Sequence, residues 1–253
     1  MMISRPMSPA GWFGVPALLL LALPFITLLG VMSWGDFRLA YGDWNAVAVS
    51  LGLSALSVPL IVLLGMPLAL WLARGASPLR RWAEVLVLIP LLTPPLALGI
   101  LLVSAYGPYS TLGEVLAAVG LALTNNAAAF VLAQIYGALP YFILSARAAF
   151  ESVPPSLEDA AKVLGAPPRQ VLWRVTLPLA RRGLAIAWVR AVGEFGIVLV
   201  FSYFPQGISV KLYINLQNDG INAVYSLICL LLVFTLPFPL WCLATGRQRR
   251  RLI

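Results

Sequence analysis

Residues 47–73 read VAVSLGLSALSVPLIVLLGMPLALWLA, a run of 27 residues without one charged side chain. A helix rises about 1.5 Å per residue, so roughly 20 apolar residues cross a hydrocarbon core about 30 Å thick. This run is therefore long enough to span a membrane. The whole chain has the same character, because 61% of its 253 residues are hydrophobic and only 10% are charged. Ordinary globular proteins carry about 25% charged residues. We predict an all-α polytopic membrane protein.

Five further apolar blocks of similar length accompany the first, which makes six predicted spans. They are Phe13–Met32, Ala83–Ala105, Asn126–Phe150, Gly183–Phe204 and Ala223–Thr245. The segment Leu112–Leu123 is too short to span and contains a glutamate, so we expect an interfacial or re-entrant helix there. The first block has no small-x-small cleavage site after it, and we interpret it as a retained anchor.

The basic residues predict the orientation, because Lys and Arg near span ends stay preferentially in the cytoplasm. With both termini inside, all but three of the 17 basic residues are cytoplasmic; the exceptions are Arg38, Arg190 and Lys211. The net charge of +8 raises the question of nucleic-acid binding. However, the terminal cluster RQRRR (247–251) directly follows the last span, where such clusters orient the chain and contact anionic lipid. We expect no nucleic-acid partner.

Several kinds of chemistry are missing from the sequence. It contains no histidine, and its two cysteines, Cys229 and Cys242, form no metal or redox motif. We expect both to act as small apolar residues. No G-x-x-x-x-G-K-[ST] phosphate loop occurs, so the chain has no recognisable ATP site. We predict a conduit that is not an enzyme and that binds no cofactor itself.

The most polar segment, SVPPSLEDAAKVLGAPPRQVLWRVTLP (152–178), predicts a capped helical turn between the fourth and fifth spans. Pro154 and Pro155 end the preceding helix. Ser156 is the expected N-cap, with Asp159 completing a capping box, and Gly165 suits a left-handed C-terminal position. The helix has one apolar stripe, made of Leu157, Ala160, Ala161 and Leu164. At about nine residues it is marginal alone in water. It either lies on the inner leaflet or docks a partner protein, and the small alanines slightly favour docking.

This segment resembles the EAA loop of the membrane subunits of ABC importers, with seven positions in register: Asp159, Ala160, Ala161, Gly165, Val175, Leu177 and Pro178. The one departure is an aspartate where the family usually has glutamate. The resemblance implies a coupling helix that inserts into a cleft of a separate ATPase subunit, which holds ATP and Mg. The implied coupling residues are Ser156, Leu157, Glu158, Asp159, Ala160, Ala161, Leu164, Gly165 and Ala166.

The fifth predicted span carries two charges in WVRAVGEFGIVLVFSYFP (188–205), Arg190 and Glu194, one helical turn apart. Ionisable groups inside a membrane are costly and mark functional sites by default. A structural i, i+4 ion pair is the competing interpretation. Two glycines beside the glutamate permit close helix contact or a bend. The candidate pathway or gate residues are Arg190, Gly193, Glu194, Phe195 and Gly196.

The run RAVGEFG (190–196) resembles the oxyanion branch of these permeases, and SYFP (202–205) and SVKLYINLQNDG (209–220) are most similar to its molybdate/tungstate members. The resemblance implies a type I importer fold in the cell membrane, with a single permease domain over residues 1–253. Its core is 47–245, its anchor helix 13–32 and its coupling loop 151–182. Two copies, two ATPase chains and an extracytoplasmic binding protein would form the complex. Sulfate, thiosulfate or another small solute stays open as the substrate. A stand-alone secondary transporter and a docking scaffold are the alternatives from other classes.

Overall fold

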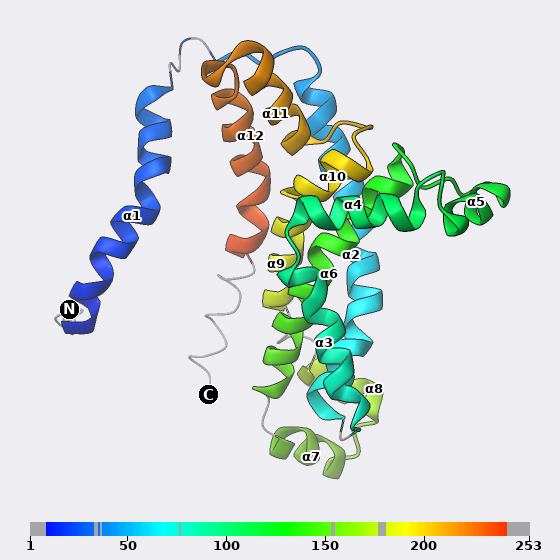
Figure 1. Cartoon of the computed structure of the whole chain (residues 1–253). Helices are drawn as coiled ribbons and strands as arrows, with labels where there is room; N and C mark the ends of the chain where they lie inside the picture. Colours follow the sequence, from blue (N-terminus) through cyan, green and yellow to red (C-terminus); the bar gives the residue numbers. More distant parts are fainter. Residues whose placement is uncertain are drawn as a thin grey trace.

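The computed structural model describes residues 9–32, 35, 37–75, 77–152, 155–176 and 181–241, and all of its regular elements in these ranges are helical (Figure 1). The first six helices are α1 (Pro9–Val31), α2 (Asp43–Arg74), α3 (Leu79–Leu92), α4 (Pro95–Tyr106), α5 (Thr111–Ala118) and α6 (Ala127–Glu151). The next six are α7 (Pro155–Val163), α8 (Pro168–Val171), α9 (Arg181–Val192), α10 (Gly196–Phe201), α11 (Ile208–Asp219) and α12 (Tyr225–Thr235). A π-helical turn, Leu172–Thr176, follows α8, and a 3-10 turn, Ile221–Ala223, precedes α12. The predicted all-α architecture is confirmed.

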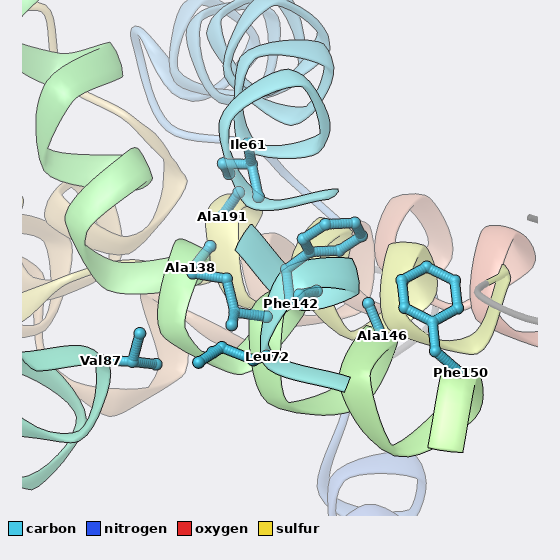
Figure 2. Close-up of a cluster of buried hydrophobic side chains, with 10 residues drawn as sticks. Ile61, Leu72, Val87, Ala138, Phe142, Ala146, Phe150 and Ala191 are labelled. Carbon is cyan, nitrogen blue, oxygen red and sulfur yellow. The ribbon is translucent and has the colours of Figure 1, made fainter. Parts of the chain in front are cut away.

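Helix α6 is the centre of the bundle, with α2 and α9 packed against it (Figure 1). It begins at Asn126, whose side-chain oxygen accepts a 2.8 Å hydrogen bond from the Ala129 amide and caps the first turn. Alanines such as Ala138 are fully buried on α6 and let the neighbouring helices approach closely. Figure 2 shows the resulting core, in which Phe142 and Phe150 of α6 lie among side chains of α2, α3 and α9.

The third predicted span is not one helix. Residues 83–105 fall on α3 and α4, and the chain direction bends by 110° between these two helices. Thr93 is extended, with ψ 128°, and two prolines follow it. A proline disfavours helical geometry in the residue before it, and this accounts for the bend. Our expectation of a continuous span was wrong here, although the TPP sequence carried the signal.

The fifth predicted span is also interrupted. Helix α9 ends at Val192, and α10 begins at Gly196 and runs for only 6 residues. Gly193, Glu194 and Phe195 lie in the break between the two helices. The predicted span over residues 183–204 is therefore broken where the two glycines permitted a bend, and a charged residue occupies the gap.

By length and apolarity, four described segments qualify as membrane spans: Gly14–Val31, Asp43–Arg74, Ala127–Glu151 and Ile221–Trp241. The bent α3–α4 pair qualifies as a fifth. The count of six and the orientation stay predictions. Helix α5 has 8 residues and projects to one side of the bundle, in agreement with a short non-spanning helix (Figure 1). The start of α1 and the end of α12 lie toward the same end of the molecule as α7 (Figure 1).

Helix α1 stands apart from the bundle along most of its length (Figure 1). Almost none of its membrane-spanning window is buried inside the chain; Leu28, near its C-terminal end, is the exception among the described residues of that window. Its C-terminal end contacts α12, where the Cys229 thiol lies 3.3 Å from the Met32 sulfur. Cys229 is a free, partly buried thiol, and Cys242 lies outside the described residues. Most of α1 therefore lies apart from the core, and its role as an anchor stays a prediction.

Candidate pathway site and coupling loop

The two charges of the fifth span lie together. Arg190 Nη1 is 2.9 Å from Glu194 Oε2, and the Glu194 side chain is 1% exposed against 26% for Arg190. The contact is an ion pair without hydrogen-bond geometry. The other carboxylate oxygen of Glu194 accepts a 3.2 Å hydrogen bond from the Ile197 amide at the start of α10. The guanidinium carbon of Arg190 lies 5.2 Å from the centre of the Tyr141 ring on α6. Both charges are thus held by fixed partners.

The other candidate pathway residues make separate contacts. The Phe195 ring packs 5.6 Å from the Tyr213 ring of α11. Gly196 lies against the first residue of α4, because a Cβ built on it would come 2.7 Å from the Pro95 Cβ. Gly193 is exposed in the break. The break therefore joins α9 and α10 to two other elements, and only Arg190 and Glu194 among the five candidates form a direct pair.

Sequence reasoning missed two residues of α6 that complete this site. Gln134 is fully buried, and its amide nitrogen donates to Ser54 Oγ of α2 at 2.8 Å and to the Ala191 carbonyl at 2.9 Å. Gly137 lies against Glu194, since a Cβ on it would come 2.9 Å from the Glu194 carboxyl carbon. A glutamine in the apolar middle of the fourth block was the available signal for Gln134, because buried polar groups require partners.

A small cavity of about 50 Å³ lies beside Arg190. It is bounded by Thr93 and Pro95 at the α3–α4 bend and by Tyr136 and Tyr141 of α6. Such a volume accommodates water. The bend in α3–α4, the break in the fifth span and the middle of α6 therefore meet at one polar point inside an apolar bundle.

The predicted coupling loop contains a capped helix. Gly165 has φ +80°, which confirms the left-handed position, and the Ala166 amide donates to the Ala161 carbonyl at 3.0 Å. This bond closes a Schellman motif at the end of α7. Helix α7 begins at Pro155, so Ser156 lies in its first turn and is not the N-cap. The proline accounts for the earlier start, because its fixed φ suits the first helical position.

The apolar side chains of this loop face outward. Leu157 is 52% exposed, Leu164 is 87% exposed, and Trp173 in the turn after α8 is 66% exposed. Ala160 and Asp159 are also exposed, and Ala161 and Ala166 are half-buried. Except at half-buried Ala161, the described part of this chain therefore leaves the predicted stripe uncovered. The side chains of Glu158 and Val175, and all of Leu177 and Pro178, lie outside the described residues.

Four charged residues link the helices just above the loop. On α3, Arg80 Nε lies 3.0 Å from Glu84 Oε1; on α6, Arg147 Nε lies 2.8 Å from Glu151 Oε1. Two bridges cross between the helices, Arg147–Glu84 at 3.0 Å and Arg80–Glu151 at 3.3 Å. We call these four residues the loop-side ion cluster. It connects the arm of the bent pair to the last turn of α6, which leads into α7.

The comparisons with known proteins point to one family. The family described as binding-protein-dependent transport system inner membrane component matches residues 61–242. The molybdenum transport system permease protein ModB of Mycobacterium tuberculosis is 34% identical over 239 residues, 89% of this chain and 90% of the relative. The sulfate transport system permease protein CysW of Synechocystis is 31% identical over 214 residues, 79% of this chain and 78% of the relative.

A solved structure shares the fold. A chain of a bacterial alginate ABC transporter, in complex with an alginate pentasaccharide-bound periplasmic protein, superposes with a TM-score of 0.65. It is 20% identical and the match covers 94% of this chain and 93% of that one. Sequence and fold therefore agree, and this chain belongs to the family of inner membrane components of binding-protein-dependent transport systems.

Proposed function

We propose that this chain is the permease subunit of an ABC importer, that two copies form the pathway, and that its substrate is molybdate or tungstate. The observation that carries the proposal is α7, a capped helix that presents Leu157 and Leu164 outward. A nine-residue helix needs a packing partner, and apolar side chains this exposed next to basic loops suit a protein cleft. The chain has no phosphate loop, so the partner is the subunit that hydrolyses ATP.

The substrate class rests on the relatives. A molybdenum permease is 34% identical to this chain over 89% of its length. Sulfate is the second candidate, since the cyanobacterial sulfate permease is 31% identical. The pathway site does not by itself select an anion, because Glu194 offsets the positive charge of Arg190 at 2.9 Å. We assign most of the selectivity to an extracytoplasmic binding protein. We further propose that the coupling residues 156–161 and 164–166 contact an ATPase subunit, so that the two copies of this chain engage two ATPase subunits.

Uptake into proteoliposomes tests this proposal. Vesicles contain this chain with the ATPase subunit that copurifies with it, ATP is sealed inside, and the binding protein and radiolabelled molybdate are added outside. We expect accumulation that requires ATP, the binding protein and the ATPase subunit, with tungstate competing and sulfate competing weakly. Accumulation driven by this chain alone would replace the proposal with a stand-alone transporter. Preferred accumulation of sulfate would support the importer function but would make sulfate, and not molybdate or tungstate, the substrate.

A further inference from the structure

We propose that Gln134 and Gly137 of α6 are positioning residues that hold the break in the fifth span in place, so that α6 transmits movement from the coupling loop to the Arg190–Glu194 pair. This inference rests on the proposed function. Neither residue belongs to the predicted coupling loop, and neither was among the candidate residues named from the sequence. Their role follows from what each contacts on either side of the break.

Gln134 holds the end of α9. The Ala191 carbonyl precedes the break, where the helical ladder stops, and accepts only a 3.3 Å bond from the Glu194 amide along its own chain. The Gln134 amide nitrogen supplies a second bond at 2.9 Å. A carbonyl only accepts, so the nitrogen and not the oxygen of the glutamine must face it. The second hydrogen of the same nitrogen goes to Ser54 Oγ at 2.8 Å, which ties this point to α2 as well.

Gly137 makes room for the glutamate. Residues three apart share one face of a helix, so Gln134 and Gly137 meet the break side by side. The carboxyl group of Glu194 occupies the space that a side chain at Gly137 would take, with its carboxyl carbon 2.9 Å from the built Cβ. Any larger residue must displace the carboxylate from the Ile197 amide or from Arg190. One face of α6 thus sets both sides of the break.

The same helix reaches the coupling loop. Glu151 is the last residue of α6 and accepts from Arg147 and Arg80 in the loop-side ion cluster. Between the two ends, α6 is packed by fully buried side chains such as Phe142 and Ala146 (Figure 2). Pro140 interrupts the hydrogen-bond ladder of α6 between Gly137 and Glu151, but a close-packed interior has low compressibility, so the packing around α6 transmits displacement along the helix. Displacement of its lower end therefore shifts the contacts at Gln134 and Gly137 together, and with them the charge pair.

The first test replaces the glutamine by a residue of similar shape without donors, Gln134→Met. The variant loses both hydrogen bonds of Gln134, to Ala191 and to Ser54. In the reconstituted complex we expect the number of anions imported per ATP hydrolysed to fall about fivefold, the effect of losing the buried bond to Ala191. The amount of assembled complex stays unchanged. The matched control is Ser54→Ala, which removes the other partner of Gln134 but keeps the bond to Ala191. This control keeps coupling within about twofold, because the break still has its donor.

The second test adds a side chain at Gly137 and then shortens the side chain of Glu194 to make room for it. Gly137→Ala lowers coupling, and Glu194→Asp in the same chain, which withdraws the carboxylate by one methylene group, restores part of it. Hydrogen exchange of the amides at 193–197, measured on the purified chain without substrate, rises in Gln134→Met and Gly137→Ala and falls back in the double variant. If the complex imports no oxyanion, the proposed function fails while the exchange result still decides this inference. Wild-type exchange and coupling in Gln134→Met would overturn it.

Discussion

Arg147 of α6 and Glu84 of α3 form an ion pair, with Nη1 and Oε1 3.0 Å apart, at the end of the bundle that leads into the coupling loop. The two side chains are 21% and 31% exposed. The pair therefore connects the bent α3–α4 arm to α6, the helix that precedes α7 in the chain. Since the cluster contains two arginines and two glutamates, basic residues that the sequence offered as topology signals also have a structural role.

Removing Arg147 destabilises this junction. In Arg147→Met, Glu84 and Glu151 keep only Arg80 between them, and we expect an interaction free energy of about 0.5–1 kcal/mol between Arg147 and Glu84 in a double-mutant cycle with Glu84→Gln. The measurement is thermal unfolding in detergent at low and high salt. High salt should reduce this interaction free energy, because it screens the two charges. Arg81→Met, at an exposed position next to Arg80, is the control and should change little. An interaction free energy of zero between Arg147 and Glu84 would show that the ion cluster does not stabilise this junction.

The coupling loop depends on its left-handed glycine. We expect Gly165→Asp to leave insertion intact but to abolish import and weaken association with the ATPase subunit, because a side chain at φ +80° strains the end of α7 by about 1–2 kcal/mol. Ala161→Glu should act in the same way through the docking face. Gly120→Asp is the matched control, since Gly120 has φ +81° and equally open surroundings but lies outside the loop. Equal transport by the Gly165 and Gly120 variants would argue against docking through α7.

The Arg190–Glu194 pair is either a structural bridge or part of the pathway, and two variants separate these roles. Arg190→Ala leaves Glu194 buried without its cation, which costs several kcal/mol, so assembly and uptake both fall. The double variant Arg190→Ala, Glu194→Gln removes the uncompensated charge and should recover assembly. We expect uptake to stay low in it, because the pathway has lost both charges. Recovery of uptake together with assembly would assign the pair to structure alone, and normal uptake in Arg190→Ala would contradict any role.

At the opposite end, the segment that resembles the molybdate/tungstate members is tied into the fold. Asn215 Nδ2 donates to Asp43 Oδ1 at 3.0 Å, and both residues are buried. Asn215→Leu leaves the carboxylate short of one donor, so we expect a loss of about 1–3 kcal/mol in stability, measured by thermal unfolding. Anion preference should not change. Asn218→Leu, three residues on and exposed, is the control. A changed anion preference with unchanged stability would place Asn215 at the substrate.

The orientation is checked with reporter fusions at Asn125 and Arg169. A positive-inside arrangement with six spans places the first outside and the second in the cytoplasm. A cytoplasmic signal at Asn125 would overturn that arrangement.

Some structural features of this protein can be predicted from short stretches of its sequence. The apolar runs predicted spanning helices because the hydrocarbon core sets their length, and Gly165 predicted the end of α7 because a single residue type suits a left-handed turn. The Pro94–Pro95 pair also marked the bend, although the apolar run around it masked the signal. These features depend on residues within a few positions of each other.

The tertiary structure alone decided the partners of the buried polar groups. Gln134 meets Ala191 from 57 positions away and Ser54 from 80, and Gly137 meets Glu194 across the same interface. The sequence showed Arg190 and Glu194 as a pair and permitted a bend beside the glutamate, but it did not give the contacts that hold Glu194 in the break. Hydrophobic pattern reports which side of a helix avoids water. It does not report which helix lies there, because that choice depends on close packing of side chains brought together only when the chain folds.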